Sequence, residues 1–187
     1  MEYQTNIVRM VIGSWGSYNE CNERALGSKW LNFDDFDDWD EIVEELKKQG
    51  FQLDGIDEEL FVQDIEGVPT DSKNWDYVHP KEIFELIKKS GVLDEQRKYD
   101  TMEAFCEVRS FDEWADLVNN HEDRWDDDIY LYIGYDWDDY GREMFEACCY
   151  ELPDSLECYF DFERFGRDCN YYNATEYSGG IIEIPLQ

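Results

Sequence analysis

The sequence predicts an α+β fold in three parts: a small α/β domain, a short helical bundle and a C-terminal α/β domain. Strand-like apolar runs occur in the first and last thirds of the chain, whereas three amphipathic helical stretches follow one another in the middle. The 187 residues include 31 aromatic side chains, which can supply a packed core despite a net charge of −31. We place the domains at residues 1–77, 78–123 and 124–187.

The N-terminal domain is predicted to hold three short strands and one helix. The expected strands are residues 7–12, 29–33 and 60–62. A loop rich in Gly, Ser and Asn is expected over residues 13–22. The helix begins at Asp38, because Glu41 three residues later completes a capping-box pattern, and Gly50 ends it.

Three helices are predicted for the middle of the chain. Pro80 begins the first at its most favourable position, and Gly91 ends it. Asp94 is the expected cap of the second helix. Ser110 and Glu113 form a further capping box at the start of the third. Short amphipathic helices in succession indicate a small bundle.

The C-terminal domain is predicted to combine strands and helices again. Apolar residues alternate with tyrosines over residues 129–133, which is typical of a strand. One helix is expected from about Asp136, and another over residues 153–167. Residues 172–177 and 181–185 are expected to pair as a hairpin.

One octapeptide pattern occurs twice in this domain. Residues 136–143 (DWDDYGRE) and 161–168 (DFERFGRD) share the order Asp, aromatic, acid, any residue, aromatic, Gly, Arg, acid. An internal duplication explains the pattern, and so does a chance likeness between two amphipathic helix starts.

The acidic charge is spread along the whole chain. Asp and Glu number 47 against 16 Lys and Arg, and the net charges of residues 1–50, 51–100, 101–150 and 151–187 are −6, −7, −12 and −6. Such a balance argues against direct nucleic-acid binding, which needs a basic surface. It favours partners that are themselves basic, and DNA-binding surfaces are prominent among these.

The sequence carries no sign of a membrane segment, a cofactor or a metal. No apolar run approaches the roughly 18 residues of a transmembrane helix, and the first five residues do not resemble a signal peptide. We expect a cytoplasmic protein with no membrane partner. The six cysteines lack a framework spacing, so we expect reduced thiols, with the role of Cys148 and Cys149 open.

Several functions for the carboxylates were weighed. A calcium loop starting at Asp136 lacks oxygen ligands at Tyr140 and Ala147. A carboxylate-dependent hydrolase stays an alternative, although 47 acids produce suitable pairs by chance, and no nucleophile or phosphate-loop motif occurs. Adaptation to salt, and an acidic adaptor or chaperone for basic proteins, are further alternatives. We predict that the chain is not an enzyme.

The remaining interpretation is that carboxylates stand in for the phosphates of duplex DNA. DNA carries one charge per about 1.7 Å, so 31 charges correspond to about 53 Å, or roughly 15 base pairs. The predicted mimic surface consists of Asp34, Asp35, Asp37, Asp38, Asp40, Glu41, Glu44, Glu45, Asp112, Glu113, Asp116, Glu122, Asp123, Asp126, Asp127, Asp128, Asp138, Asp139, Glu143 and Glu146.

Residues 150–168 (YELPDSLECYFDFERFGRD) closely resemble a recurring stretch of the ArdA family of antirestriction proteins. The ending at residues 180–184 (GIIEI) and the opening at residues 18–20 and 26–31 (YNE and LGSKWL) are similar to that family as well. The chain departs from the family where Cys21 replaces a usual Gly and Cys169 a usual Leu.

The resemblance implies an elongated, curved homodimer, joined through its C-terminal domains, that mimics bent DNA. Its target would be type I restriction–modification enzymes, especially their methyltransferase core, and such proteins are usually carried by mobile genetic elements. The motif residues are assigned to the core or to the dimer contact. They are Leu152, Pro153, Leu156, Tyr159, Phe160, Asp161, Phe162, Phe165, Gly166, Arg167 and Asp168.

Overall fold

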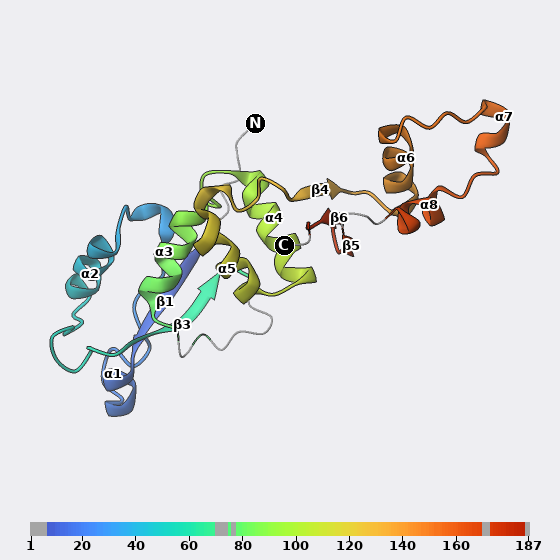
Figure 1. Cartoon of the computed structure of the whole chain (residues 1–187). Coiled ribbons are helices and arrows are strands. Elements are labelled where there is room, and N and C mark those ends of the chain that lie inside the picture. The colour runs from blue at the N-terminus through green and yellow to red at the C-terminus, as the bar shows by residue number, and fades with distance from the viewer. Residues whose placement is uncertain (1–6, 70–74, 76–77, 170–172, 186–187) are drawn as a thin grey trace. The chain divides into compact units, whose positions relative to one another are not determined.

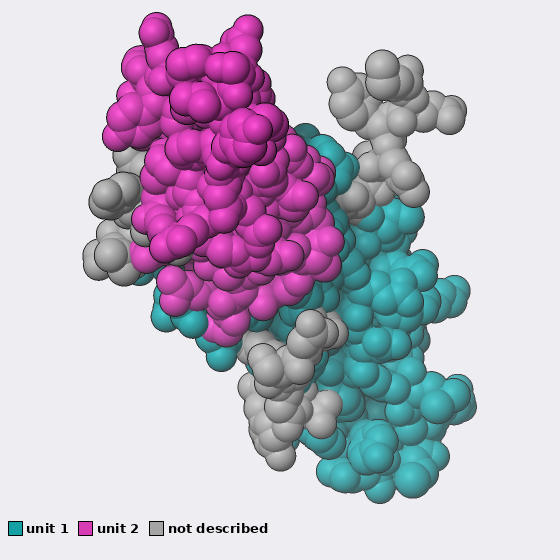
Figure 2. Space-filling model, turned by 90° about the vertical axis from the view of Figure 1, so that its right-hand side faces the viewer, with its two compact units in different colours: residues 1–103, 111–125 teal, residues 104–110, 126–187 magenta. Residues whose placement is uncertain are grey.

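The computed structural model describes residues 7–69, 75, 78–169 and 173–185. Within them, eight α-helices and two three-stranded antiparallel sheets confirm the predicted α+β class. The chain divides into two compact units, residues 1–103 with 111–125 and residues 104–110 with 126–187 (Figure 2). The division into three domains stays a prediction.

The sheet of the first unit has the strand order β2-β1-β3, with both pairings antiparallel. Its strands are β1 (Arg9–Ser14), β2 (Leu31–Asn32) and β3 (Leu60–Glu66). Met10 of β1 stands opposite both Leu31 and Ile65, and all three side chains are buried. Directly opposite residues point to the same face of a sheet. This row therefore marks the face that covers the core.

The loop predicted over residues 13–22 is wrong in its middle, where helix α1 (Trp15–Glu20) forms. Ser14 caps this helix by accepting a hydrogen bond from the backbone N–H of Ser17. The hydroxyl of Ser17 in turn donates to the buried carboxylate of Asp57. Contacts with a distant part of the chain therefore stabilise a short helix that its own sequence does not favour.

The next helices begin close to their predicted caps. They are α2 (Trp39–Lys48), α3 (Pro80–Ser90), α4 (Gln96–Val108) and α5 (Phe111–His121), with 3₁₀ turns η1 (Phe33–Asp35) and η3 (Glu122–Arg124). Asp38 accepts a hydrogen bond of 3.0 Å from the N–H of Glu41 at the start of α2. Gly91 ends α3 in the left-handed conformation at φ 73°. Helix α4 starts two residues after the predicted cap, Asp94.

Aromatic side chains fill much of the core of the first unit. The rings of Phe33 and Phe84 lie 5.3 Å apart, which joins η1 to α3, and α3 also contacts β3 (Figure 1). Trp114 of α5 is fully buried against Trp125, whose indole N–H donates to the carbonyl of Ser90. These large side chains explain how a chain with such excess charge folds.

The sheet of the second unit has the order β4-β6-β5 and contains the predicted hairpin. Its strands are β4 (Tyr130–Ile133), β5 (Ala174–Tyr177) and β6 (Gly180–Glu183). Ser178 in the hairpin turn donates from its backbone N–H and its hydroxyl to the Glu107 carboxylate, at 2.7 and 2.8 Å. The central strand β6 is buried along its whole length.

The helix predicted over residues 153–167 is divided in two. Helices α6 (Trp137–Ala147), α7 (Asp154–Glu157) and α8 (Phe162–Asp168) follow β4 along the chain (Figure 1). Asp161 accepts a hydrogen bond of 2.9 Å from the N–H of Arg164 and so begins a new helix. An aspartate side chain that bonds to the backbone in this way interrupts helical periodicity.

The first octapeptide forms the start of α6, the second forms the cap and the whole of α8, and their contacts are reciprocal. Asp136 and Asp161 cap the two helices. The guanidinium of Arg142 lies 4.1 Å from the ring centre of Phe162, and that of Arg167 lies 4.9 Å from the ring centre of Trp137. Equivalent positions of the pattern thus make equivalent contacts.

Candidate functional site

The structure places most of the predicted mimic residues at the surface. Of the twenty acids, seventeen are exposed, and Glu45 and Asp138 are half-buried. Asp126 is the exception, because only 2% of it is exposed. Its assignment to the surface was therefore wrong, since a buried carboxylate cannot meet a partner's basic side chain. Asp127 and Asp128, the next two residues, are exposed.

Many of these acids lie at helix N-termini, where the helix dipole favours negative charge. Asp38 and Asp136 are the caps of α2 and α6, and further acids fill the first turns of α2, α5 and α6. Glu41 also accepts a hydrogen bond of 2.8 Å from the N–H of Asp37. Each such placement stabilises a helix by about 0.3–1 kcal/mol. The fold therefore offsets part of the repulsion between its own carboxylates.

The basic side chains are largely held by neighbouring acids. At least ten of the sixteen Lys and Arg lie within ion-pair distance of a carboxylate. Arg142, for example, contacts Asp138 at 2.8 Å and Glu157 at 2.9 Å. A hydrogen bond from Lys47 lowers the pKa of Glu44, and the same pair raises the pKa of Lys47. Such pairing leaves a surface on which uncompensated negative charge predominates.

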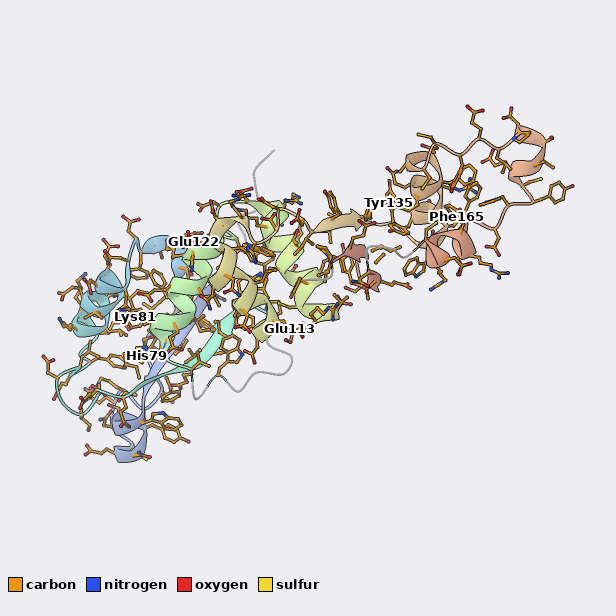
Figure 3. All side chains as sticks on the ribbon, in the orientation of Figure 1. His79, Lys81, Glu113, Glu122, Tyr135 and Phe165 are labelled. Carbon is orange, nitrogen blue, oxygen red and sulfur yellow. The ribbon has the colours of Figure 1, made fainter. Side chains whose placement is uncertain are left out.

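The motif residues separate into a buried set and an exposed set. Phe162 and Gly166 are buried, and Leu152, Phe160 and Phe165 are half-buried. The ring of Phe165, labelled in Figure 3, lies 5.5 Å from that of Phe145 and joins an aromatic cluster between α6 and α8. The exposed members are Pro153, Leu156, Tyr159, Asp161, Arg167 and Asp168. Tyr159 is 82% exposed.

A groove between α3 and α5 was not anticipated from the sequence. It has a volume of about 600 Å³ and belongs wholly to the first unit. Its α3 wall includes Glu82 and Glu85, two exposed acids outside the predicted mimic set, and its α5 wall includes Asp112 and Asp116 from that set. The sequence offered one signal for this groove: Glu82 and Glu85 lie three residues apart on one helix, and each is followed by an apolar residue, Ile83 or Leu86.

Within the described residues, neither a candidate metal site nor a membrane-spanning helix occurs. No group of three or more His, Cys, Asp or Glu within them is arranged to hold a metal ion. No helix in the same part of the chain is both long and apolar enough to cross a bilayer.

Comparison with protein families gives a match over most of the chain. The family model described as antirestriction protein (ArdA) matches residues 10–183, a range that covers all the described helices and strands except Arg9, the first residue of β1. No curated protein matches the chain.

Proposed function

Since the chain belongs to the ArdA family of antirestriction proteins, we propose that it acts against type I restriction–modification enzymes as a noncatalytic mimic of duplex DNA. The observation that carries the mechanism is the exposure of the predicted acids, seventeen of twenty, across both units. Their carboxylates would contact the Lys and Arg side chains that otherwise hold DNA phosphates.

Helix geometry supports a repeated spacing of charge along this surface. Residues four apart on a helix share a face and are separated by about 6 Å along its axis. Asp40 and Glu44 of α2, Asp112 and Asp116 of α5, and Asp139 and Glu143 of α6 are such pairs. Since many carboxylates act together, each would contribute little alone, and binding would weaken as salt screens the charges.

The proposed target site is the DNA-binding groove of the methyltransferase core. An inhibitor seated there would exclude DNA and so block restriction. It would also block modification to the extent that both reactions depend on DNA bound to that core. The protein itself would bind no nucleic acid, because its net charge of −31 repels phosphates.

A homodimer joined through the C-terminal unit is part of the proposal. Large apolar side chains stay exposed around α7, with exposed fractions of 57% for Tyr150, 50% for Leu156 and 82% for Tyr159. Aromatic side chains such as these two tyrosines are enriched at protein interfaces. Two copies would double the length of acidic surface offered to the target. The site of action would be the cytoplasm, where the enzyme meets DNA.

A competition assay tests the proposal. Purified type I methyltransferase is bound to a fluorescent duplex containing its site, and the protein is titrated in at two salt concentrations. We expect displacement at a stoichiometric amount of dimer and weaker displacement at higher salt. A duplex that stays bound at large excess and low salt would contradict the proposal. Equal binding to unrelated basic proteins would instead indicate an acidic adaptor.

A further inference from the structure

The groove between α3 and α5 has an apolar floor. Its lining includes Ile83, Leu86 and Phe111, which are 2%, 8% and 5% exposed, and the half-buried Ala115. On each helix these residues lie at helical spacing, so one stripe of α3 faces one stripe of α5. The volume of about 600 Å³ lies within the usual range of ligand pockets, roughly 300–1,000 Å³.

The rim of the groove is acidic on both sides. Glu82 and Glu85 come from α3, Asp112 and Asp116 come from α5, and all four are exposed. Lys81 lies 3.5 Å from Glu85 and compensates part of this charge. The rim nevertheless presents carboxylates from both walls above a hydrocarbon floor.

Lys89 places one cation of the chain itself beside the groove. This side chain of α3 lines the groove, and its ammonium donates to the carbonyl of Asn119 at the end of α5, at 3.2 Å. The ammonium also lies 3.8 Å from Glu122, which Figure 3 labels. A cation on an alkyl stem from the chain itself thus lies at one end of the groove.

From the apolar floor and the acidic rim of the groove, we infer that it binds an arginine side chain presented by the protein partner. The alkyl stem of arginine would lie on Ile83 and Leu86, and the planar guanidinium would bond to carboxylates of the rim. Arginine suits this position better than lysine, because a guanidinium is more weakly hydrated and donates through a rigid fork.

The inference rests on the proposed DNA mimicry and extends the mimicry from the phosphates of DNA to its minor groove. DNA-binding proteins insert arginine side chains into the minor groove, which lies between two rows of phosphates. The two acidic walls over a narrow hollow would present the same arrangement to the same arginine. The target would therefore recognise a shape here as well as a charge density.

An NMR titration with n-propylguanidinium chloride tests the site without any target enzyme. The compound reproduces an arginine side chain, and guanidinium chloride at equal concentration is the control that lacks the alkyl stem. We expect saturable shifts of the methyl resonances of Ile83, Leu86 and Ala115, with guanidinium binding several-fold more weakly. Equal effects of both compounds, or shifts distributed over the acids of every helix, would overturn the inference.

Two variants separate shape from charge in this titration. Ala115→Leu fills the groove with hydrocarbon and leaves the charge unchanged, so it should weaken binding by roughly tenfold or more, the equivalent of about 1.4 kcal/mol. Asp116→Asn should weaken it by roughly two- to fivefold, as expected for an exposed ion pair. Glu58→Gln removes one exposed charge elsewhere on the same unit and should have no effect. Full binding by both groove variants would contradict the inference.

The competition assay then distinguishes the two proposals. If the unmodified protein displaces DNA and Ala115→Leu does so roughly tenfold less well, both hold. If Ala115→Leu is as effective as the unmodified protein, the groove is not used and only the further inference fails. If the unmodified protein displaces nothing, the proposed function fails, whereas the titration still decides whether the groove binds guanidinium.

Discussion

Gly141 and Gly166 pack backbone against backbone where α6 contacts α8. A Cβ atom on Gly166 would lie 2.9 Å from the nitrogen of Gly141 and 2.6 Å from the carbonyl oxygen of Trp137. A Cβ on Gly141 would meet the carbonyl of Phe162, which holds the position of Trp137 in the other octapeptide. The repeated pattern therefore has a structural cause, since each half needs glycine where the backbone of the other half approaches.

Replacing Gly166 with alanine should destabilise the second unit. The added methyl meets backbone atoms, which cannot move aside as a flexible side chain would, so we expect a loss of about 3 kcal/mol in the free energy of unfolding. Urea denaturation followed by tryptophan fluorescence measures this change. Gly55→Ala is the control, because its nearest neighbour would be 3.6 Å away. A Gly166→Ala protein as stable as that control would contradict the close packing.

Asp57 should make the first unit sensitive to acid. Burial opposes its ionisation, but hydrogen bonds from Ser17 and the N–H of Gln52, with the charge of Arg24, hold its pKa below the usual 3.8. A lowered pKa stabilises the fold above pH 3.8, and this contribution is lost as the pH falls through the folded-state value. Asp57→Asn should therefore cost about 3 kcal/mol at pH 7 and progressively less below pH 3.8.

Unfolding of Asp57→Asn and of the unmodified protein across pH 2–7 measures this difference. Asp54→Asn, an exposed aspartate three residues earlier, is the matched control. A constant difference between Asp57→Asn and the unmodified protein over the whole pH range would show that the lost stability does not depend on the charge of Asp57.

Local signals in the sequence were sufficient for much of the fold. Asp38 acts through its side chain, and Pro80 and Gly91 act through their backbone geometry, so the start of α2 and both ends of α3 follow from residue type alone. Helix α1 could not be predicted, because its stability depends on Ser17 meeting Asp57, forty residues away. The break before α8 was missed because apolar periodicity continues across the capping Asp161.

The candidate site was less predictable, because residue type does not determine exposure. Asp126, Asp127 and Asp128 form one acidic run, yet only the first is buried. Glu82 and Asp116 gain a shared groove only when α3 and α5 come together. Composition thus predicted an acidic surface. Which acids are exposed, and where a groove forms between them, depend on tertiary packing.

Tyr140 and Tyr132 should make the second unit sensitive to alkali. Their hydroxyls lie 2.5 and 3.4 Å from the same oxygen of buried Glu183. Burial, with the Glu183 charge and hydrogen bond, raises the pKa of Tyr132 to about 12 and that of Tyr140 further. A raised pKa stabilises the fold below the unfolded value near 10 and ceases to do so as the pH rises through the folded value.

Tyr140→Phe tests this contact. It should cost about 1–3 kcal/mol at pH 7, because it removes the shorter hydrogen bond to a buried carboxylate. The difference from the unmodified protein should narrow above pH 10, and denaturation at pH 7 and pH 11 measures it. Tyr159→Phe, which changes a tyrosine of the same unit that is 82% exposed, should change neither value. An equal effect of both variants would contradict a specific role for Glu183.

Asp127 and Asp128 should act in target binding and not in folding. Both are exposed, so replacing them together with asparagine should change the unfolding free energy by no more than about 0.5 kcal/mol. The same change should weaken DNA displacement and reduce its dependence on salt. Each single variant should have a small effect. Loss of all displacement from one single, folded variant would contradict a distributed mimic.

Phe165 and Tyr159 belong to the same motif but should differ in what they stabilise. Phe165 is half-buried among aromatic rings, 5.5 Å from Phe145 and 5.7 Å from Phe160, so Phe165→Ala should lower the unfolding free energy by about 1–3 kcal/mol. Tyr159 is 82% exposed, and Tyr159→Ala should leave that free energy nearly unchanged. If the dimer uses this surface, Tyr159→Ala should instead raise the dimer dissociation constant, which sedimentation equilibrium measures. Because the ring of Tyr159 is so little covered by its own chain, its removal could weaken the dimer only through a direct contact with the second copy. An unchanged dissociation constant would therefore place the dimer contact away from Tyr159.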